Sequence, residues 1–173
     1  VQMPIQSATW IIEPRGAKPE VVDLVARDLG LQVRGQEPGP DREHGRFSWS
    51  EHLQHVLLML PIGHSFFEQV YQERDGMLRL RKLAWRPSSS ISRVNVARDG
   101  GLISIEQHAT SQPIPVDRLV AYVNEREGGN WLGQSLLRAA YKNWLLKDRM
   151  LRTQALVVER NGLGVPVYEA APA

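Results

Sequence analysis

Histidine is the residue type in this sequence best suited to acid–base or metal chemistry, and three of its five histidines lie close together. They are His52, His55 and His64, and Glu51 directly precedes the first. Imidazole and carboxylate groups bind zinc, but the zinc-peptidase pattern is His-Glu-x-x-His, which is absent here. The sequence also has no cysteine. We therefore expect no metal ion, and we place the histidines on the polar face of a helix.

Serine-containing stretches are the other candidates for chemistry. The Gly-Gln-Ser stretch that ends at Ser135 lacks the second glycine of a nucleophile elbow, because position 137 is leucine, so Ser135 is better explained as a helix cap. "RPSSSISR", from Arg86 to Arg93, is typical of a loop. No Gly-x(4)-Gly-Lys-Ser/Thr phosphate loop is present. We expect neither an enzyme nor a cofactor.

Positive charge is concentrated in the middle of the chain. Residues 71–98 contain seven basic and two acidic side chains, whereas the net charge of all 173 residues is +2. Such a patch favours a polyanionic partner such as DNA. The five tryptophans are scattered instead of spaced as a platform for stacking bases.

The composition is that of a soluble globular protein, with 42% hydrophobic and 23% charged residues. The longest apolar run, "VLLML", is too short to cross a membrane. The first ten residues lack the features of a signal peptide, which favours a cytoplasmic origin. A chain that starts at Val1 and stops after "GVPVYEAAPA" indicates a segment of a longer protein.

The first sixty residues predict short elements. We expect a strand at residues 7–14, then a helix at residues 19–29 that begins at Pro19, ends at Gly30, and has Val21, Val25 and Leu29 on one face. A polar loop is expected at residues 35–45.

A second helix is predicted at residues 50–60. Ser50 is its expected cap and Pro61 its limit. Its apolar stripe consists of Leu53, Val56, Leu57 and Leu60.

Residues 65–124 carry β patterns. Asp75-Gly76 and Asp99-Gly100-Gly101 each separate two strand-like runs and predict hairpins, and a further strand follows at residues 117–124. Helices flank these hairpins without alternating with them. The expected class is therefore α+β, with an antiparallel hairpin lobe between helical segments.

A long helix is predicted from Ser135 to Gly162, about 40 Å long at 1.5 Å per residue. Its apolar arc is wider than one neighbour covers. The apolar side chains that form this arc are Leu136, Leu137, Ala140, Tyr141, Trp144, Leu146, Met150 and Leu151. The basic residues of the helix include Arg138, Lys142, Lys147, Arg149 and Arg152. Two interpretations remain open here: a solvated surface helix, or a helix that packs laterally against copies of itself.

The order of several segments resembles the portal proteins of tailed bacteriophages and prophages, especially the Mu-like branch. The resemblance runs from about Ser7 to Val167. The segments that carry it are "PIGHSFFEQVYQERDGMLRLRKLAWRPSSSI", "DGGLISIEQ", "IPVDRLVAYV", "GGNWLGQSLLRAAYKNWLLKDRML" and "VERNGLGVPV".

This resemblance implies a structural subunit of a head–tail connector ring, expected to be a dodecamer, at one capsid vertex. Double-stranded DNA would pass through the ring without sequence-specific binding. By this scheme residues 1–49 are wing-like, residues 50–130 hold the first stem-like helix and a β-rich, clip-like lobe, and residues 131–173 hold the second stem-like helix and return towards the wing.

The resemblance also implies partners and places: the large terminase subunit, capsid and head-completion proteins, the virion, and the host bacterial cytoplasm during assembly. Candidate channel or inter-subunit residues are Arg138, Lys142, Lys147, Arg149 and Arg152. Candidate terminase contacts are Arg79, Arg81, Lys82 and Arg86, and candidate interface anchors are Tyr141 and Trp144. The alternative is a nucleic-acid-binding module that forms no ring.

Overall fold

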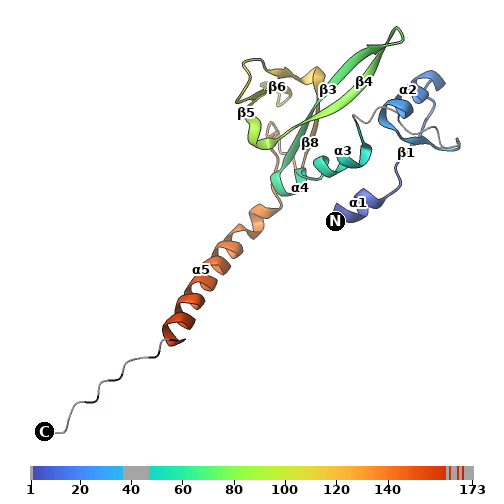
Figure 1. The fold of residues 1–173 in the computed structure, drawn as a ribbon. Helices are drawn as coiled ribbons and strands as arrows, with labels where there is room; N and C mark the ends of the chain where they lie inside the picture. The colour runs from blue at the N-terminus through green and yellow to red at the C-terminus, as the bar shows by residue number, and fades with distance from the viewer. Residues whose placement is uncertain (1, 37–46, 163, 165–166, 168, 170–173) are drawn as a thin grey trace. The chain divides into compact units, whose positions relative to one another are not determined.

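The computed structural model describes residues 2–36, 47–162, 164, 167 and 169. The chain divides into two compact units, Val1–Leu136 and Leu137–Ala173, and each is described by itself (Figure 1). The first unit contains two antiparallel sheets with short helices, and the second contains one long helix. The predicted α+β class is confirmed.

The N-terminal segment forms α1 (Gln2–Ser7), β1 (Ile11–Ile12), α2 (Pro19–Leu29) and β2 (Gln32–Val33), and β1 pairs with β2 in parallel. The strand predicted at residues 7–14 is only two residues long, and Ser7 ends a helix instead. The bounds of α2 are as predicted, with Pro19 first and Gly30 in the left-handed region after it.

The predicted buried face of α2 is wrong. Val21 and Val25 are exposed, whereas Val22 and Asp28 are buried. The cause is an ion pair between Asp28 and Arg79, which fixes the side of α2 that meets the sheet. Most of the loop predicted at residues 35–45 lies outside the described residues.

The helix predicted at residues 50–60 is broken. It forms α3 (Trp49–Val56) and α4 (Met59–Ile62), and the chain turns between them where Leu58 N–H donates to the His55 carbonyl. Ser50 lies inside α3, since the N-cap is Ser48, and Pro61 lies inside α4. Leu53, Val56 and Leu57 are buried as expected.

The larger sheet consists of β3 (His64–Arg74), β4 (Met77–Arg86) and β8 (Leu119–Val123) in the order β4-β3-β8, with antiparallel pairing throughout. Figure 1 shows β3 and β4 as a long hairpin. Its turn is Asp75-Gly76, where φ is 54° and 72°. Positive φ at both central residues is the type I′ geometry that matches strand twist, so the predicted hairpin is confirmed.

The smaller sheet consists of β5 (Ile91–Val96), β6 (Leu102–Gln107) and β7 (Ile114–Pro115) in the order β5-β6-β7. The β5–β6 turn contains the predicted Asp-Gly-Gly stretch, in which Gly100 N–H donates to the Ala97 carbonyl. Short 3-10 turns, Ser88–Ser90 and Val116–Arg118, precede β5 and β8.

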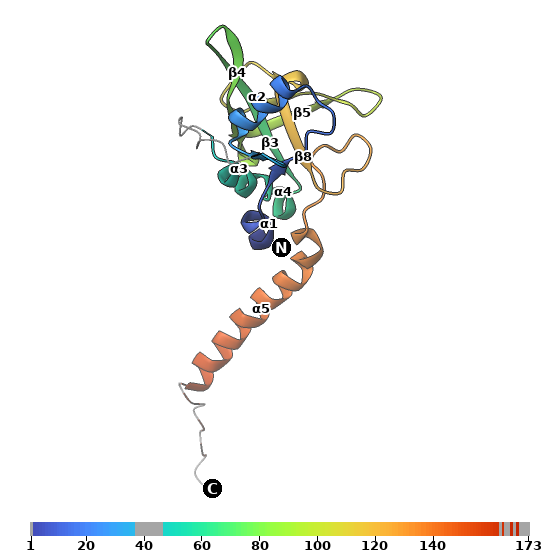
Figure 2. The same cartoon turned by 90° about the vertical axis from the view of Figure 1, so that its right-hand side faces the viewer.

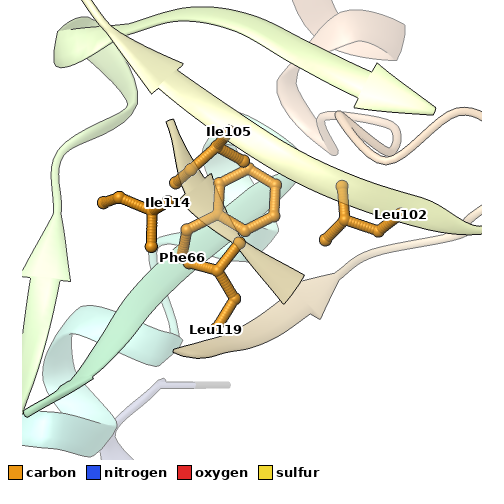
Figure 3. Close-up of a cluster of buried hydrophobic side chains, with 5 residues drawn as sticks. All are labelled: Phe66, Leu102, Ile105, Ile114 and Leu119. Atoms are coloured by element: carbon orange, nitrogen blue, oxygen red, sulfur yellow. The ribbon is translucent and has the colours of Figure 1, made fainter. Parts of the chain in front are cut away.

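Alternation along β3 gives the first unit three layers. Phe66 packs with four residues of the smaller sheet and of β8 on one face: Leu102, Ile105, Ile114 and Leu119 (Figure 3). Phe67 points to the other face, where its ring lies 4.4 Å from the His52 ring of α3. Figure 2 shows α3 and α4 near the end of the sheet where β3 begins.

The second unit contains α5 (Leu137–Gly162), a helix of 26 residues. Its length agrees with the sequence prediction, although it begins two residues after Ser135. No helix among the described residues is long and apolar enough to span a membrane.

The two isoleucines of β6 test the position of the core. Ile105 is 0% exposed and Ile103 is 51% exposed. We expect Ile105→Ala to lower the free energy of unfolding by about 2–5 kcal/mol, because it leaves a cavity among Phe66 and its neighbours. Ile103→Ala should lower it by less than about 1 kcal/mol. Denaturant unfolding of the two variants checks this, and equal losses would contradict the assigned faces of β6.

Candidate subunit and nucleic-acid interfaces

The β lobe begins and ends at one crossing of the chain. Gly63 directly precedes β3 and Gly133 follows β8, and their backbones are in close contact. A Cβ atom on Gly133 would lie 2.3 Å from the Gly63 carbonyl oxygen, and one on Gly63 would lie 2.5 Å from the Leu132 carbonyl oxygen. Both glycines have positive φ. Residues with a side chain therefore do not fit at this crossing.

Hydrogen bonds hold the crossing together. Asn124 N–H donates to the Gly63 carbonyl at 2.8 Å, and Gln134 N–H donates to the Asn124 carbonyl at 2.9 Å. Leu136 N–H donates to the Leu60 carbonyl at 2.9 Å. The Ser135 hydroxyl donates to the Pro61 carbonyl. The residues just before α5 are thus fixed to α4.

A second set of contacts attaches the 124–136 loop to the smaller sheet. The Trp131 indole N–H donates to the Gly100 carbonyl at 2.9 Å, and the Arg126 guanidinium lies 4.4 Å from the centroid of the Trp131 ring. Trp131 also packs against the core cluster. These contacts make the loop part of the folded lobe.

The histidines do not lie on a polar face, so that prediction is wrong. His52 is 3% exposed. Its ring is surrounded by aromatic rings, with centroid distances of 5.3 Å to Trp49 and 4.4 Å to Phe67. Its Nε2 lies 3.1 Å from the Tyr122 hydroxyl oxygen. The predicted apolar stripe began at Leu53 and left out the polar residue before it. In the structure both His52 and Leu53 are buried.

Burial changes the acid–base properties of this pocket. Desolvation, together with repulsion from His55, lowers the pKa of His52 to about 4. Desolvation also lowers the pKa of His64, although its ring nitrogen Nδ1 lies 3.0 Å from the Leu132 carbonyl oxygen. Within the described residues, no three His, Asp or Glu side chains are arranged to hold a metal ion.

Two of the four candidate terminase contacts are held inside the chain. The Arg79 guanidinium donates to Asp28 Oδ1 at 2.6 and 2.8 Å, and Leu80 N–H donates to Asp28 Oδ2 at 2.9 Å. Arg86 pairs with Glu68 on the neighbouring strand. Lys82 is exposed, and Arg81 lies beside it in β4.

Sequence reasoning missed Asp28. It lies in the last turn of α2, where the helix dipole disfavours a carboxylate. An acidic residue at such a position is the signal that could have revealed a specific partner. Its carboxylate accepts a hydrogen bond from the Leu80 N–H of β4 and joins the N-terminal segment to the hairpin.

The candidate residues of α5 fall into separate groups. Arg138, Lys142 and Arg149 lie along one side of the helix, because they differ by at most about 40° at 100° per residue. Lys147 lies on another side. Arg152 pairs with Asp148 at 3.0 Å.

The two candidate anchors are adjacent and exposed. The rings of Tyr141 and Trp144 stack with a centroid distance of 6.0 Å, and the residues are 60% and 59% exposed. Stacking orders two large apolar side chains that no other described residue of this unit buries.

We expect the first unit to lose stability in acid. A histidine whose pKa is lower in the folded state makes the fold most stable above its unfolded pKa of 6.5, and that stability falls as pH drops towards 4. The loss should approach about 1.4 kcal/mol per pH unit for His52. Denaturant unfolding of the chain between pH 7.5 and 4.5 measures it.

Two variants isolate the contribution of His52. His52→Gln should flatten the pH dependence, whereas His108→Gln, at an exposed position, should leave it as in the parent chain. An unchanged slope in His52→Gln would show that other groups cause the acid sensitivity.

The Asp28–Arg79 pair should be costly to break. The Asp28 and Arg79 side chains are only 12% and 16% exposed. Arg79→Gln leaves the buried carboxylate without its cation and should lower the free energy of unfolding by about 3 kcal/mol or more. Lys82→Gln, on the same strand, should cost less than about 0.5 kcal/mol. The double variant Asp28→Asn/Arg79→Gln should lose less than the sum of the single variants in denaturant unfolding. Additive losses would argue against coupling.

Comparison with known proteins identifies the family. The family model described as the portal protein of Mu bacteriophage matches residues 1–173, the whole chain. No curated protein matches the chain. Portal proteins are structural components of the phage head and assemble as oligomers. This match agrees with the resemblance carried by the hairpin lobe and the long helix, and the chain belongs to the family of Mu-like bacteriophage portal proteins.

Proposed function

We propose that the chain is part of a ring-forming portal subunit through which double-stranded DNA is packaged and ejected. The observation that carries this proposal is the exposure of α5. None of its 26 residues is buried. Its large apolar side chains are at least half exposed at nine positions: Leu137, Tyr141, Trp144, Leu146, Met150, Leu151, Leu156, Val157 and Val158.

An isolated helix of this composition exposes much apolar surface to water, which is unfavourable. Exposed apolar side chains at these positions leave a hydrophobic surface that partners normally cover. A ring supplies such partners on two sides of every subunit, because its contacts are heterologous. Membership of an oligomeric family supports copies of this chain as those partners.

The β lobe suits the clip of the proposed subunit. Residues 64–123 lie between α4 and α5, and both ends of this segment meet where His64 pairs with Val123. A lobe with adjacent ends can be inserted between two helical segments without separating them. By this scheme α3 and α4 precede the clip as the first stem-like segment, α5 follows it as the second, and residues 1–49 belong to the wing.

A channel through which DNA moves should bind DNA only weakly. Each phosphate that a protein neutralises adds salt-dependent affinity, which would retard moving DNA. A net charge of +2 over 173 residues is compatible with passage instead of tight binding. This balance supports the channel over a module that binds nucleic acid without a ring.

The finer assignments follow from the same proposal. The ring is a dodecamer at the capsid vertex of a phage or prophage particle, assembled in the host cytoplasm and retained in the virion with capsid and head-completion proteins. Arg81 and Lys82 are the members of the basic set that the clip would offer to the large terminase subunit, because Arg79 and Arg86 already bind Asp28 and Glu68.

Trp144 tests the ring. In the full-length portal protein, Trp144→Ala removes a large apolar side chain from α5 and should weaken assembly, since aromatic anchors contribute strongly to interfaces. Lys142→Gln, two residues earlier, should leave assembly nearly unchanged because exposed charges contribute little. Native mass spectrometry and electron microscopy distinguish rings from monomers. Normal rings from Trp144→Ala would place this side of α5 on a solvated surface.

A further inference from the structure

The contact between α2 and β4 is made by a buried carboxylate. Asp28 lies in the last turn of α2, beside the β3–β4 hairpin (Figure 1). Its Oδ1 accepts two hydrogen bonds from the Arg79 guanidinium, and its Oδ2 accepts one from the Leu80 N–H. Two adjacent residues of one strand therefore bind both oxygens of the Asp28 carboxylate.

The two donors on β4 form a binding site for carboxylates in general. A guanidinium matches the planar geometry of a carboxylate, and charge-assisted hydrogen bonds are stronger than neutral ones. The neighbouring backbone N–H of Leu80 adds a donor to the second oxygen. This site recognises the two oxygens of an Asp or Glu side chain, whichever chain carries that side chain.

The position of Asp28 in its helix makes it a weakened occupant. The carbonyl end of a helix carries partial negative charge, which disfavours a carboxylate in the last turn. A buried ion pair also recovers only part of the hydration that its charges lose. A carboxylate on an extended segment would meet the same donors without opposition from a helix dipole.

Apolar contacts hold this side of α2 only in part. Val21, Val25 and Asp28 lie on one side of the helix, within about 60° of one another. Asp28 is 9% exposed, whereas the two valines are 50% and 38% exposed. The core cluster around Phe66 is built from residues 66–131. Movement of α2 away from β4 would therefore leave that core in place.

We propose that α2 is a releasable cover over a carboxylate-binding site on β4. In the free chain Asp28 fills the site made by Arg79 and the Leu80 N–H, and an acidic segment of a partner protein displaces it. This inference goes beyond the ring and does not depend on it.

Displacement requires more than one contact from the partner. Asp28 is tethered beside the site, so its effective concentration there is high and a single free carboxylate competes poorly. Lys82 is exposed on the same strand and gives an acidic segment a second point of attachment. Because coupling between two ligands of one site is reciprocal, whatever weakens the contact of α2 should strengthen binding of the partner.

Binding of an acidic probe to variants of the full-length portal protein tests the site. Asp28→Asn removes the carboxylate that covers it, and Asp28→Asn/Arg79→Gln removes the cation as well. Asp23→Asn is the matched control, since it makes the same change in charge at an exposed position of α2. The probe is fluorescent poly-L-glutamate, followed by anisotropy, with double-stranded DNA as a second probe.

Asp28→Asn should bind poly-L-glutamate at least about fivefold more tightly than the parent protein, because the site is no longer filled in most molecules. Asp23→Asn should gain less than about twofold, since an exposed charge acts weakly. The double variant should lose the gain. Both Asp28 variants lack the ion pair, so a difference between them reports on the arginine and not on loosening of α2.

Three results would overturn the site: equal gains in Asp28→Asn and Asp23→Asn, a gain that persists in the double variant, or a gain for DNA without one for poly-L-glutamate. The last would assign this surface to nucleic acid instead of an acidic protein segment.

Hydrogen exchange tests the displacement itself. Saturating poly-L-glutamate should speed amide exchange in residues 20–29 of the parent protein and leave residues 65–68 of β3 protected. Asp28→Asn should show the faster exchange without the probe. A parent protein that binds no probe, or that binds it without faster exchange in α2, would contradict release of the cover.

Discussion

The contact of Gly63 with Gly133 is the constraint on which the rest of the first unit depends. It joins the residues that enter β3 to those that leave β8, and no side chain fits between them. Strand pairing of His64 with Val123 and the bonds of Asn124 then follow at the same place. Leu136 and Ser135, the last residues of the first unit, are bound to α4.

The rest of the lobe is held by buried polar groups as much as by its core. Asp28 accepts hydrogen bonds from both the Arg79 guanidinium and the Leu80 N–H, and thereby joins α2 to β4. His52 fills an aromatic pocket between α3 and the sheet in its neutral form.

The two units meet different physical demands. The first buries its own core around Phe66, whereas α5 leaves its large apolar side chains exposed. The energy of a portal assembly would therefore come from contacts that the single chain lacks.

The sequence by itself determined the elements whose signals are local. Asp75-Gly76 and Asp99-Gly100 predicted both hairpins, Pro19 and Gly30 predicted the ends of α2, and the apolar pattern predicted α5, because turn and cap chemistry acts over a few residues. The family resemblance was also carried by these segments. Only the tertiary structure decided that α3 ends at Val56, that His52 is buried and that Asp28 binds Arg79. His52 and Asp28 depend on partners 70 and 51 residues away, which no local pattern contains.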